Sequence, residues 1–140
     1  MEMKNFKLYM LCLLVALMAS CTRNDGDIGE LYGMWRVTAI VKDGEVVKDY
    51  SGTLYFEFQS SVHIQKYVYE DRHERDDRAA MWRYQGEDVI LEFVDFAPVE
   101  ITGMQKGLSL VKVEECTGSN MVMSYESPEN EQYRYLLKKW

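Results

Sequence analysis

This 140-residue chain has little proline, cysteine or histidine: 2 prolines, 3 cysteines and 2 histidines. Few prolines leave long stretches in which every residue can donate a backbone hydrogen bond, as strands require. With no HExxH motif and no Cys/His cluster, the sequence lacks the usual zinc sites, and neither a metal nor a cofactor is expected. It also lacks a Gly-x-Ser-x-Gly elbow and a phosphate-binding glycine loop, so no nucleophile or nucleotide site is indicated.

Positive charge is in short supply as well. The 16 Lys and Arg residues are outnumbered by 23 Asp and Glu residues, which gives a net charge of −7. An acidic chain offers no basic patch for nucleic acid and no electrostatic attraction to anionic lipids. A nucleic-acid partner is therefore not expected, and attachment to a membrane would have to come from another feature.

Such a feature lies at the N-terminus, where the only long apolar run is found. Residues 8–19 carry no charge and follow Lys4 and Lys7. A positive start and a short apolar run are typical of a secretory signal, whereas a membrane-spanning helix needs about 20 residues. We therefore interpret residues 1–20 as a signal peptide.

The end of this signal resembles the lipobox of bacterial lipoproteins, since it reads Leu17-Met18-Ala19-Ser20-Cys21. Two small residues precede the cysteine as in the lipobox, and Met18 stands where Leu is usual. The resemblance implies that Cys21 carries several acyl chains, which together anchor a protein stably. Thr22, in place of Asp, favours the outer membrane, on its periplasmic face or at the cell surface. The alternative is an ordinary secreted protein with a cysteine at this position by chance.

Cleavage before Cys21 leaves about 120 residues, enough for one domain. Residues 21–30 are polar and rich in Gly and Asp, so we expect a flexible tether there and the folded domain over 31–140. Cys116 is then the one free thiol, because Cys12 leaves with the signal. No disulfide is expected, and a lone thiol is usually a small buried hydrophobe.

Beyond residue 30 the apolar residues recur with a period of two, which is the alternation of half-buried strands. In the first such segment one face carries Trp35, Val37, Ala39 and Val41. Further strands are predicted over 45–49, 53–59, 62–69, 79–85, 89–95, 108–114, 120–126 and 132–139. The remaining helix candidates are 98–107 and the charged run 70–78. Many short strands separated by turns predict an all-β fold, a single antiparallel up-and-down β-barrel of about eight strands.

Gly33-Met34-Trp35 on the first predicted strand resembles the Gly-x-Trp signature of lipocalins, and the whole domain is similar to small bacterial lipocalin-like lipoproteins. The resemblance implies a barrel in which Trp35 plugs the closed end and packs on the start of the chain. It also implies a cation across that ring, with Arg134 the best match and Lys138 the alternative. The chain is shorter than a typical lipocalin and lacks its disulfide and C-terminal helix, which counts against a roomy cavity.

A barrel of about eight strands is filled by side chains or holds one small ligand. The residues predicted to face inward are Trp35, Val37, Leu54, Phe56, Phe58, Trp82, Tyr84, Leu91, Phe93, Tyr133, Tyr135 and Leu137. The aromatic candidates for contact with a small apolar ligand are Trp35, Phe56, Phe58, Trp82, Tyr84, Tyr133 and Tyr135. Ordinary core packing is the competing interpretation of the same residues.

The charged run 70–78 is interpreted as a solvated hairpin loop. It lacks the glycine and the spacing of a calcium loop, and its three arginines compete for its carboxylates. Its candidate contact residues are Asp71, Arg72, His73, Glu74 and Arg75.

Three functions stay open from the sequence. The first is a non-enzymatic, lipid-anchored envelope protein that carries or senses a small apolar molecule. The second is an inhibitor or accessory subunit of an envelope complex, in which the barrel is filled and the loops 70–78 and 115–120 contact a protein partner. The third is an enzyme, for which His63 is the residue to test.

Overall fold

The computed structural model describes residues 7, 9–10, 29–69, 71 and 73–140. Most of the predicted signal peptide, together with Cys21 and Arg72, lies outside these residues. Within them, nine strands form one sheet. The strands are β1 (Gly33–Lys42), β2 (Glu45–Val46), β3 (Leu54–Phe58), β4 (Val62–Tyr69), β5 (Glu74–Gln85), β6 (Asp88–Phe93), β7 (Gly107–Cys116), β8 (Asn120–Glu126) and β9 (Gln132–Lys139). Two short 3-10 helices, η1 (Gly29–Leu31) and η2 (Glu100–Thr102), flank or connect them.

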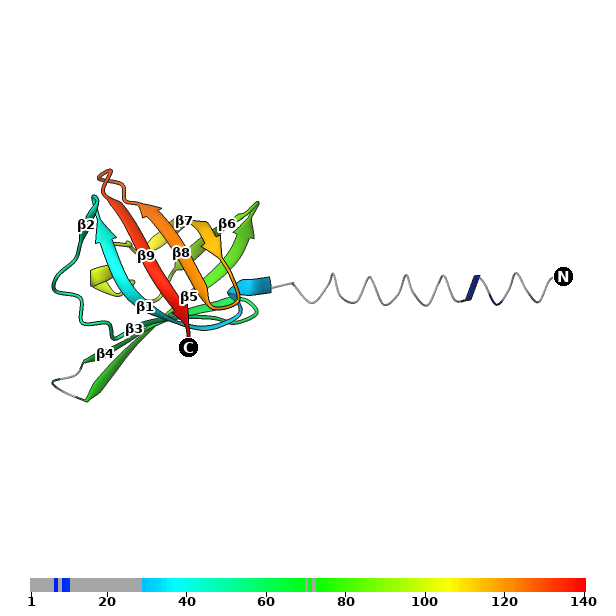
Figure 1. Ribbon diagram of the computed structural model, residues 1–140, viewed down its shortest axis with the longest axis horizontal. Coiled ribbons are helices and arrows are strands. Elements are labelled where there is room, and N and C mark those ends of the chain that lie inside the picture. The colour runs from blue at the N-terminus through cyan, green and yellow to red at the C-terminus, as the bar shows by residue number, and fades with distance from the viewer. Residues whose placement is uncertain (1–6, 8, 11–28, 70, 72) are drawn as a thin grey trace.

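The sheet closes on itself because β1 pairs with β3 at one edge and with β9 at the other (Figure 1). All neighbouring strands are antiparallel, and from β3 to β9 each pairs with the next in the chain. Eight strands form the wall, while β2 adds two residues beside the end of β1. The predicted up-and-down barrel is confirmed.

The inner face of the barrel is the hydrophobic core. Alternate residues are buried along β3, β6 and β9, as the period-two pattern predicts. Eleven of the twelve residues predicted to face inward are buried, and the twelfth, Tyr84, is 42% exposed. Tyr84 lies near the end of β5, where its ring packs edge-on against Trp82 with 5.2 Å between centroids.

A β-bulge in β1 overturns part of the predicted alternation along this strand. The pairing with β9 advances from Val37 to Ala39 while the partner advances by one residue, so one residue of β1 is extra. An extra residue reverses the alternation that follows it. Ile40 is therefore fully buried, whereas Ala39 and Val41, predicted to share the face of Trp35 and Val37, are only half-buried. The Tyr50 hydroxyl donates a hydrogen bond to the Val37 carbonyl beside the bulge.

The interpretation of 70–78 as a loop is wrong in its second half, because β5 begins at Glu74, which pairs with Tyr69. The hairpin of β4 and β5 extends beyond the barrel wall (Figure 1). Its outer part can be rich in charge because neighbouring charges pair: the Arg78 guanidinium lies 2.7 Å from an Asp76 carboxylate oxygen.

Two other segments are shorter than predicted. The strand expected over 45–49 covers Glu45–Val46 alone. The helix candidate 98–107 contains only the three residues of η2, which ends at Gly103 with a φ of +74°. Such a left-handed residue terminates a helix.

Candidate functional site

The two ends of the barrel are closed by different means. At one end, beside η1, Trp35 is fully buried and its Nε1 donates to the Leu31 carbonyl at 3.0 Å. The Lys139 Nζ lies 4.6 Å from the centre of the Trp35 ring and donates to the Tyr32 carbonyl. The prediction that Trp35 packs on the start of the chain is confirmed, and this end is called the closed end.

The cation over the tryptophan is Lys139, so the predictions of Arg134 and Lys138 are wrong. Lys139 is paired directly with Trp35 across β1 and β9, and directly opposed residues share a face of the sheet. Lys138 lies on the other face by alternation. The Arg134 guanidinium lies outside, 3.0 Å from a Glu114 carboxylate oxygen.

Gly33 explains the first position of the Gly-x-Trp motif. Its φ is +116°, and a Cβ there would lie 2.5 Å from the Lys139 Nζ. Only glycine adopts this backbone conformation readily and leaves room for the lysine across the ring.

The opposite end is covered by residues 94–106, the connection between β6 and β7, here named the lid segment. Its side chains Val99, Thr102 and Met104 are buried. The Thr102 hydroxyl donates to the Val99 carbonyl at 2.7 Å and accepts from the Met104 N–H at 3.2 Å, which holds the segment in a compact turn. This end is called the open end, since no strand closes it.

Interior side chains hold the lid segment by hydrogen bonds. The Gln65 Oε1 accepts from the Val99 N–H at 2.9 Å, and the Gln65 Nε2 donates to the Met104 sulfur at 3.4 Å. The Tyr135 hydroxyl donates to the Thr102 carbonyl. Gly103 packs on Tyr133 so closely that a Cβ would lie 2.1 Å from a ring carbon.

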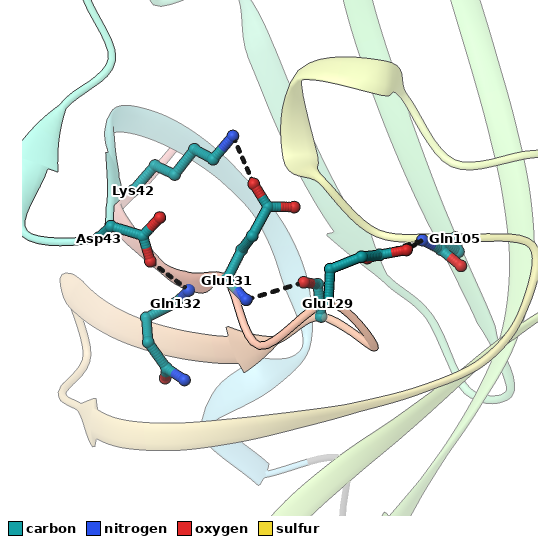
Figure 2. A network of polar contacts seen from close by, with 7 residues as sticks. Lys42, Asp43, Gln105, Glu129, Glu131 and Gln132 are labelled. Atoms are coloured by element: carbon teal, nitrogen blue, oxygen red, sulfur yellow. Dashed lines mark hydrogen bonds and ion pairs between the residues drawn. The ribbon is translucent and has the colours of Figure 1, made fainter.

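The rim of the open end carries a further polar network (Figure 2). The lid enters it through Gln105, whose Nε2 lies 3.2 Å from each carboxylate oxygen of Glu129 in the β8–β9 turn. That turn is joined to the end of β1 by an ion pair of 2.6 Å between Lys42 and Glu131. Gln105 and Glu129 are exposed, and Lys42 and Glu131 are partly exposed, so each contact contributes little to stability.

Polar groups also lie deeper in the barrel. His63 and Gln65 are fully buried and Ser109 is nearly so. The His63 Nδ1 lies 3.1 Å from the Glu57 carbonyl, which can only accept, so Nδ1 carries the proton and Nε2 is an acceptor. The His63 Nε2 and the Ser109 Oγ have no hydrogen-bond partner. Burial lowers the pKa of His63 to about 3, so the ring is neutral at physiological pH.

The barrel interior is filled in this structure. Six of the seven predicted ligand-contact residues lie inside: Trp35, Phe56, Phe58 and Tyr135 at 0% exposure, and Trp82 and Tyr133 at 6%. Ring centres of Phe56 and Tyr135 are 5.7 Å apart and those of Phe58 and Trp82 are 5.2 Å apart. Side chains without solvent exposure leave no room for a water molecule beside them, so a ligand would need the lid segment to move.

The alternation of apolar residues does not identify His63 and Gln65 as interior residues, because both side chains are polar. The pairing of β3 with β4 was the available signal: Phe58 is opposite His63 and Phe56 is opposite Gln65. The rings of Phe56 and Phe58 lie 5.2 Å and 4.6 Å from the His63 ring.

The predicted contact residues of the charged run lie at the tip of the β4–β5 hairpin. Glu74 and Arg75 are on β5, and His73 adopts a positive φ of +51° before it. A shallow cleft of about 370 Å³ separates the hairpin from the lid segment, lined by Tyr67, Tyr69, Val99, Glu100 and Ile101. The structure therefore brings the base of this hairpin and the lid together, although they are distant in sequence.

The described residues contain neither a cluster of metal ligands nor a cysteine with a lowered pKa. They contain no group of three or more His, Cys, Asp or Glu side chains that could hold a metal ion. Burial and the neighbouring Glu30 raise the pKa of the Cys116 thiol to about 11, which keeps it protonated and unreactive.

No helix in the described part of the chain has the length and apolar character needed to cross a membrane.

The chain is similar in structure to a lipocalin-like protein from Bacteroides uniformis, with a TM-score of 0.63 and 16% identity over 80% of this chain and 100% of that one. The fold is a lipocalin fold. An uncharacterized protein from Bacteroides eggerthii has a TM-score of 0.59 and 15% identity, covering 79% of this chain and 99% of that one. Lobster apocrustacyanin A1 is more distant, with a TM-score of 0.52 and 9% identity over 85% of this chain and 66% of its own.

No protein-family model and no curated protein sequence matches the chain. The structural similarity establishes the lipocalin-like barrel, and at sequence identities of 9–16% it establishes the fold alone.

Proposed function

We propose that this chain is a non-enzymatic, lipid-anchored envelope protein that binds a small apolar molecule inside its lipocalin-like barrel. The observation that carries the proposal is the closure of the open end by a segment that belongs to no strand. Its contacts to the interior are a few hydrogen bonds from Gln65 and Tyr135 and four buried side chains, since Pro98 is buried beside Val99, Thr102 and Met104. Movement of the lid segment would expose an aromatic interior without breaking the strand ladders.

The direct test is native mass spectrometry of the full-length protein, extracted from bacterial membranes in a detergent too bulky to enter the barrel. A small molecule that co-purifies and leaves on unfolding would support the proposal and name its class. An empty protein that also takes up no apolar fluorescent probe would overturn it.

The anchor is a separate part of the proposal. It is supported by the resemblance of residues 17–21 to a lipobox. The net charge of −7 is consistent with it, because an acidic chain has no electrostatic attraction to anionic lipids. Cys21→Ser should release the protein from the outer-membrane fraction and remove the mass of the acyl chains. A variant that stays in the membrane with unchanged mass would contradict lipidation at Cys21.

A second function, contact with an envelope protein, is favoured by two observations. The barrel interior is filled, as this function requires, and the β4–β5 hairpin extends beyond the barrel and carries paired charges. Photo-cross-linking from His73 in intact cells should then give a specific adduct. The same cross-linker at Glu87, in the turn between β5 and β6 at the closed end, is the control, and equal adducts at both positions would count against the hairpin.

A further inference from the structure

The interior of the barrel is polar at a few points and charged at none. Among the described residues, the buried polar side chains are His63, Gln65, Thr102, Ser109 and Ser127. None is acidic or a permanent cation, and His63 is neutral. Lys139, the cation over the Trp35 ring, is already engaged with that ring and the Tyr32 carbonyl at the closed end.

His63 presents an acceptor that nothing inside the protein satisfies. Its Nδ1 proton is committed to the Glu57 carbonyl, and its Nε2 lone pair has no donor. The surrounding rings of Phe56, Phe58 and Phe93 offer apolar contact but no hydrogen bond. Native proteins rarely leave a buried polar atom without a partner, so such an atom points to a group that is absent from the folded chain alone.

Gln65 lies two residues further along β4 and faces the same way, about 7 Å from His63 by strand geometry. Both ends of its amide are occupied by the lid segment: the oxygen by the Val99 N–H and the nitrogen by the Met104 sulfur. A thioether is a weak acceptor. If the lid segment moves, Gln65 loses both partners and becomes a free donor and acceptor beside the open end.

We infer that the ligand is a neutral apolar molecule with a hydroxyl group, which donates to the His63 Nε2 while Gln65 exchanges its lid partners for the ligand's oxygen. This inference rests on the proposed function. A carboxylate would be buried without a counter-ion, which is strongly unfavourable. A pure hydrocarbon or an ether would leave the His63 Nε2 without a donor.

The test compares three molecules with chains of similar length: 1-decanol, its isomer 1-methoxynonane and decanoate. Each displaces a bound apolar fluorescent probe, N-phenyl-1-naphthylamine, from the full-length protein at pH 7.5. We expect 1-decanol to bind about tenfold more tightly than the ether, or about 1.4 kcal/mol, and more tightly than decanoate. The preference should disappear in His63→Leu and persist in Ser124→Ala, a substitution on the outer face of β8.

A spectroscopic readout covers the case in which His63→Leu does not fold. In the wild-type protein the ¹⁵N resonance of the unprotonated His63 nitrogen should move on addition of 1-decanol and stay in place with the ether. Failure of all probes and ligands to bind would overturn the proposed function and this inference with it. Binding without preference for the alcohol, or tighter binding of decanoate, would overturn this inference alone.

Discussion

The closed end and the open end of this barrel have the same task, which is to cover an aromatic core, and they achieve it with different kinds of contact. At the closed end the cover is part of the wall: Trp35 and Lys139 are paired residues of β1 and β9. At the open end the cover is a connection between strands, held by the side chains of Gln65 and Tyr135.

The difference teaches which end can move. Opening the closed end would break the β1–β9 ladder that closes the barrel. Opening the other end would break a few side-chain hydrogen bonds and withdraw Val99, Thr102 and Met104 from the core. Segments with few buried apolar contacts open locally at lower free energy than the core strands.

The largest effect is expected from breaking the closed end. Trp35→Ala removes a fully buried ring, the hydrogen bond to Leu31 and the seat of Lys139. Large-to-small changes of this kind lower the free energy of unfolding by about 3–5 kcal/mol. Urea titration followed by circular dichroism measures it, and a loss below about 1 kcal/mol would show that this end is not a structural plug.

Acid should weaken the fold through His63, which is fully buried in the core. Its pKa is about 3 in the folded protein and near 6.5 when unfolded, so protons bind the unfolded chain first as the pH falls. The stability from a neutral His63 is complete above about pH 6.5 and is lost towards pH 3, with about 2 kcal/mol gone by pH 5.

Urea titrations at pH 7.5 and pH 5.0 measure this loss, with His63→Leu as the control. The variant should lose about 2 kcal/mol less than the wild type between the two pH values. An identical loss in both proteins would mean that His63 titrates as an ordinary exposed histidine.

Gly103→Ala sharpens the comparison from the side of the lid. A Cβ at Gly103 would meet the Tyr133 ring at 2.1 Å and the φ is +74°, so the lid segment must shift. We expect a loss of about 1–2 kcal/mol in unfolding free energy and increased uptake of an apolar fluorescent probe. Gly86→Ala is the matched control, because Gly86 has a φ of +65° but nothing within 4 Å of its Cβ position. Equal probe uptake by the two variants would argue against a lid.

The smallest effect is expected at the rim. Gln105→Ala removes the exposed contact with Glu129 shown in Figure 2. Such a contact is worth less than about 0.5 kcal/mol, so thermal unfolding should hardly change. A loss above about 1 kcal/mol would mean that the rim, and not Gln65 and Tyr135, holds the lid segment.

The strands of the barrel wall could be predicted from the sequence because apolar and polar residues alternate within each strand, independently of its partners. Trp35 at the closed end followed from a local motif for the same reason. The bulge in β1 could not be predicted from the sequence. Ala39, Ile40 and Val41 are all apolar, so the pattern does not show which of them faces the core after Val37. The cation over Trp35 was wrongly predicted because the choice between Arg134, Lys138 and Lys139 depends on the register of β9 against β1, which no local pattern shows.

The lid was hidden for a related reason. Its apolar residues Val99, Ile101 and Met104 look like a short helix, while the groups that fix it, Gln65 and Tyr135, lie more than 30 positions away in sequence. Polar residues such as Gln65 and His63 are interior only because β4 pairs with the aromatic strand β3.

Hydrogen exchange on the intact protein tests the central claim, that the open end is closed by a segment which can move by itself. The amides of Val99 and Met104, bound to the side chains of Gln65 and Thr102, should exchange at least about 100-fold faster than those of Arg36 and Lys138, which face each other in the β1–β9 ladder, a difference of about 2.7 kcal/mol. Equal protection of the two regions would mean that the lid segment opens only when the whole barrel unfolds, and would contradict this account of how a ligand enters.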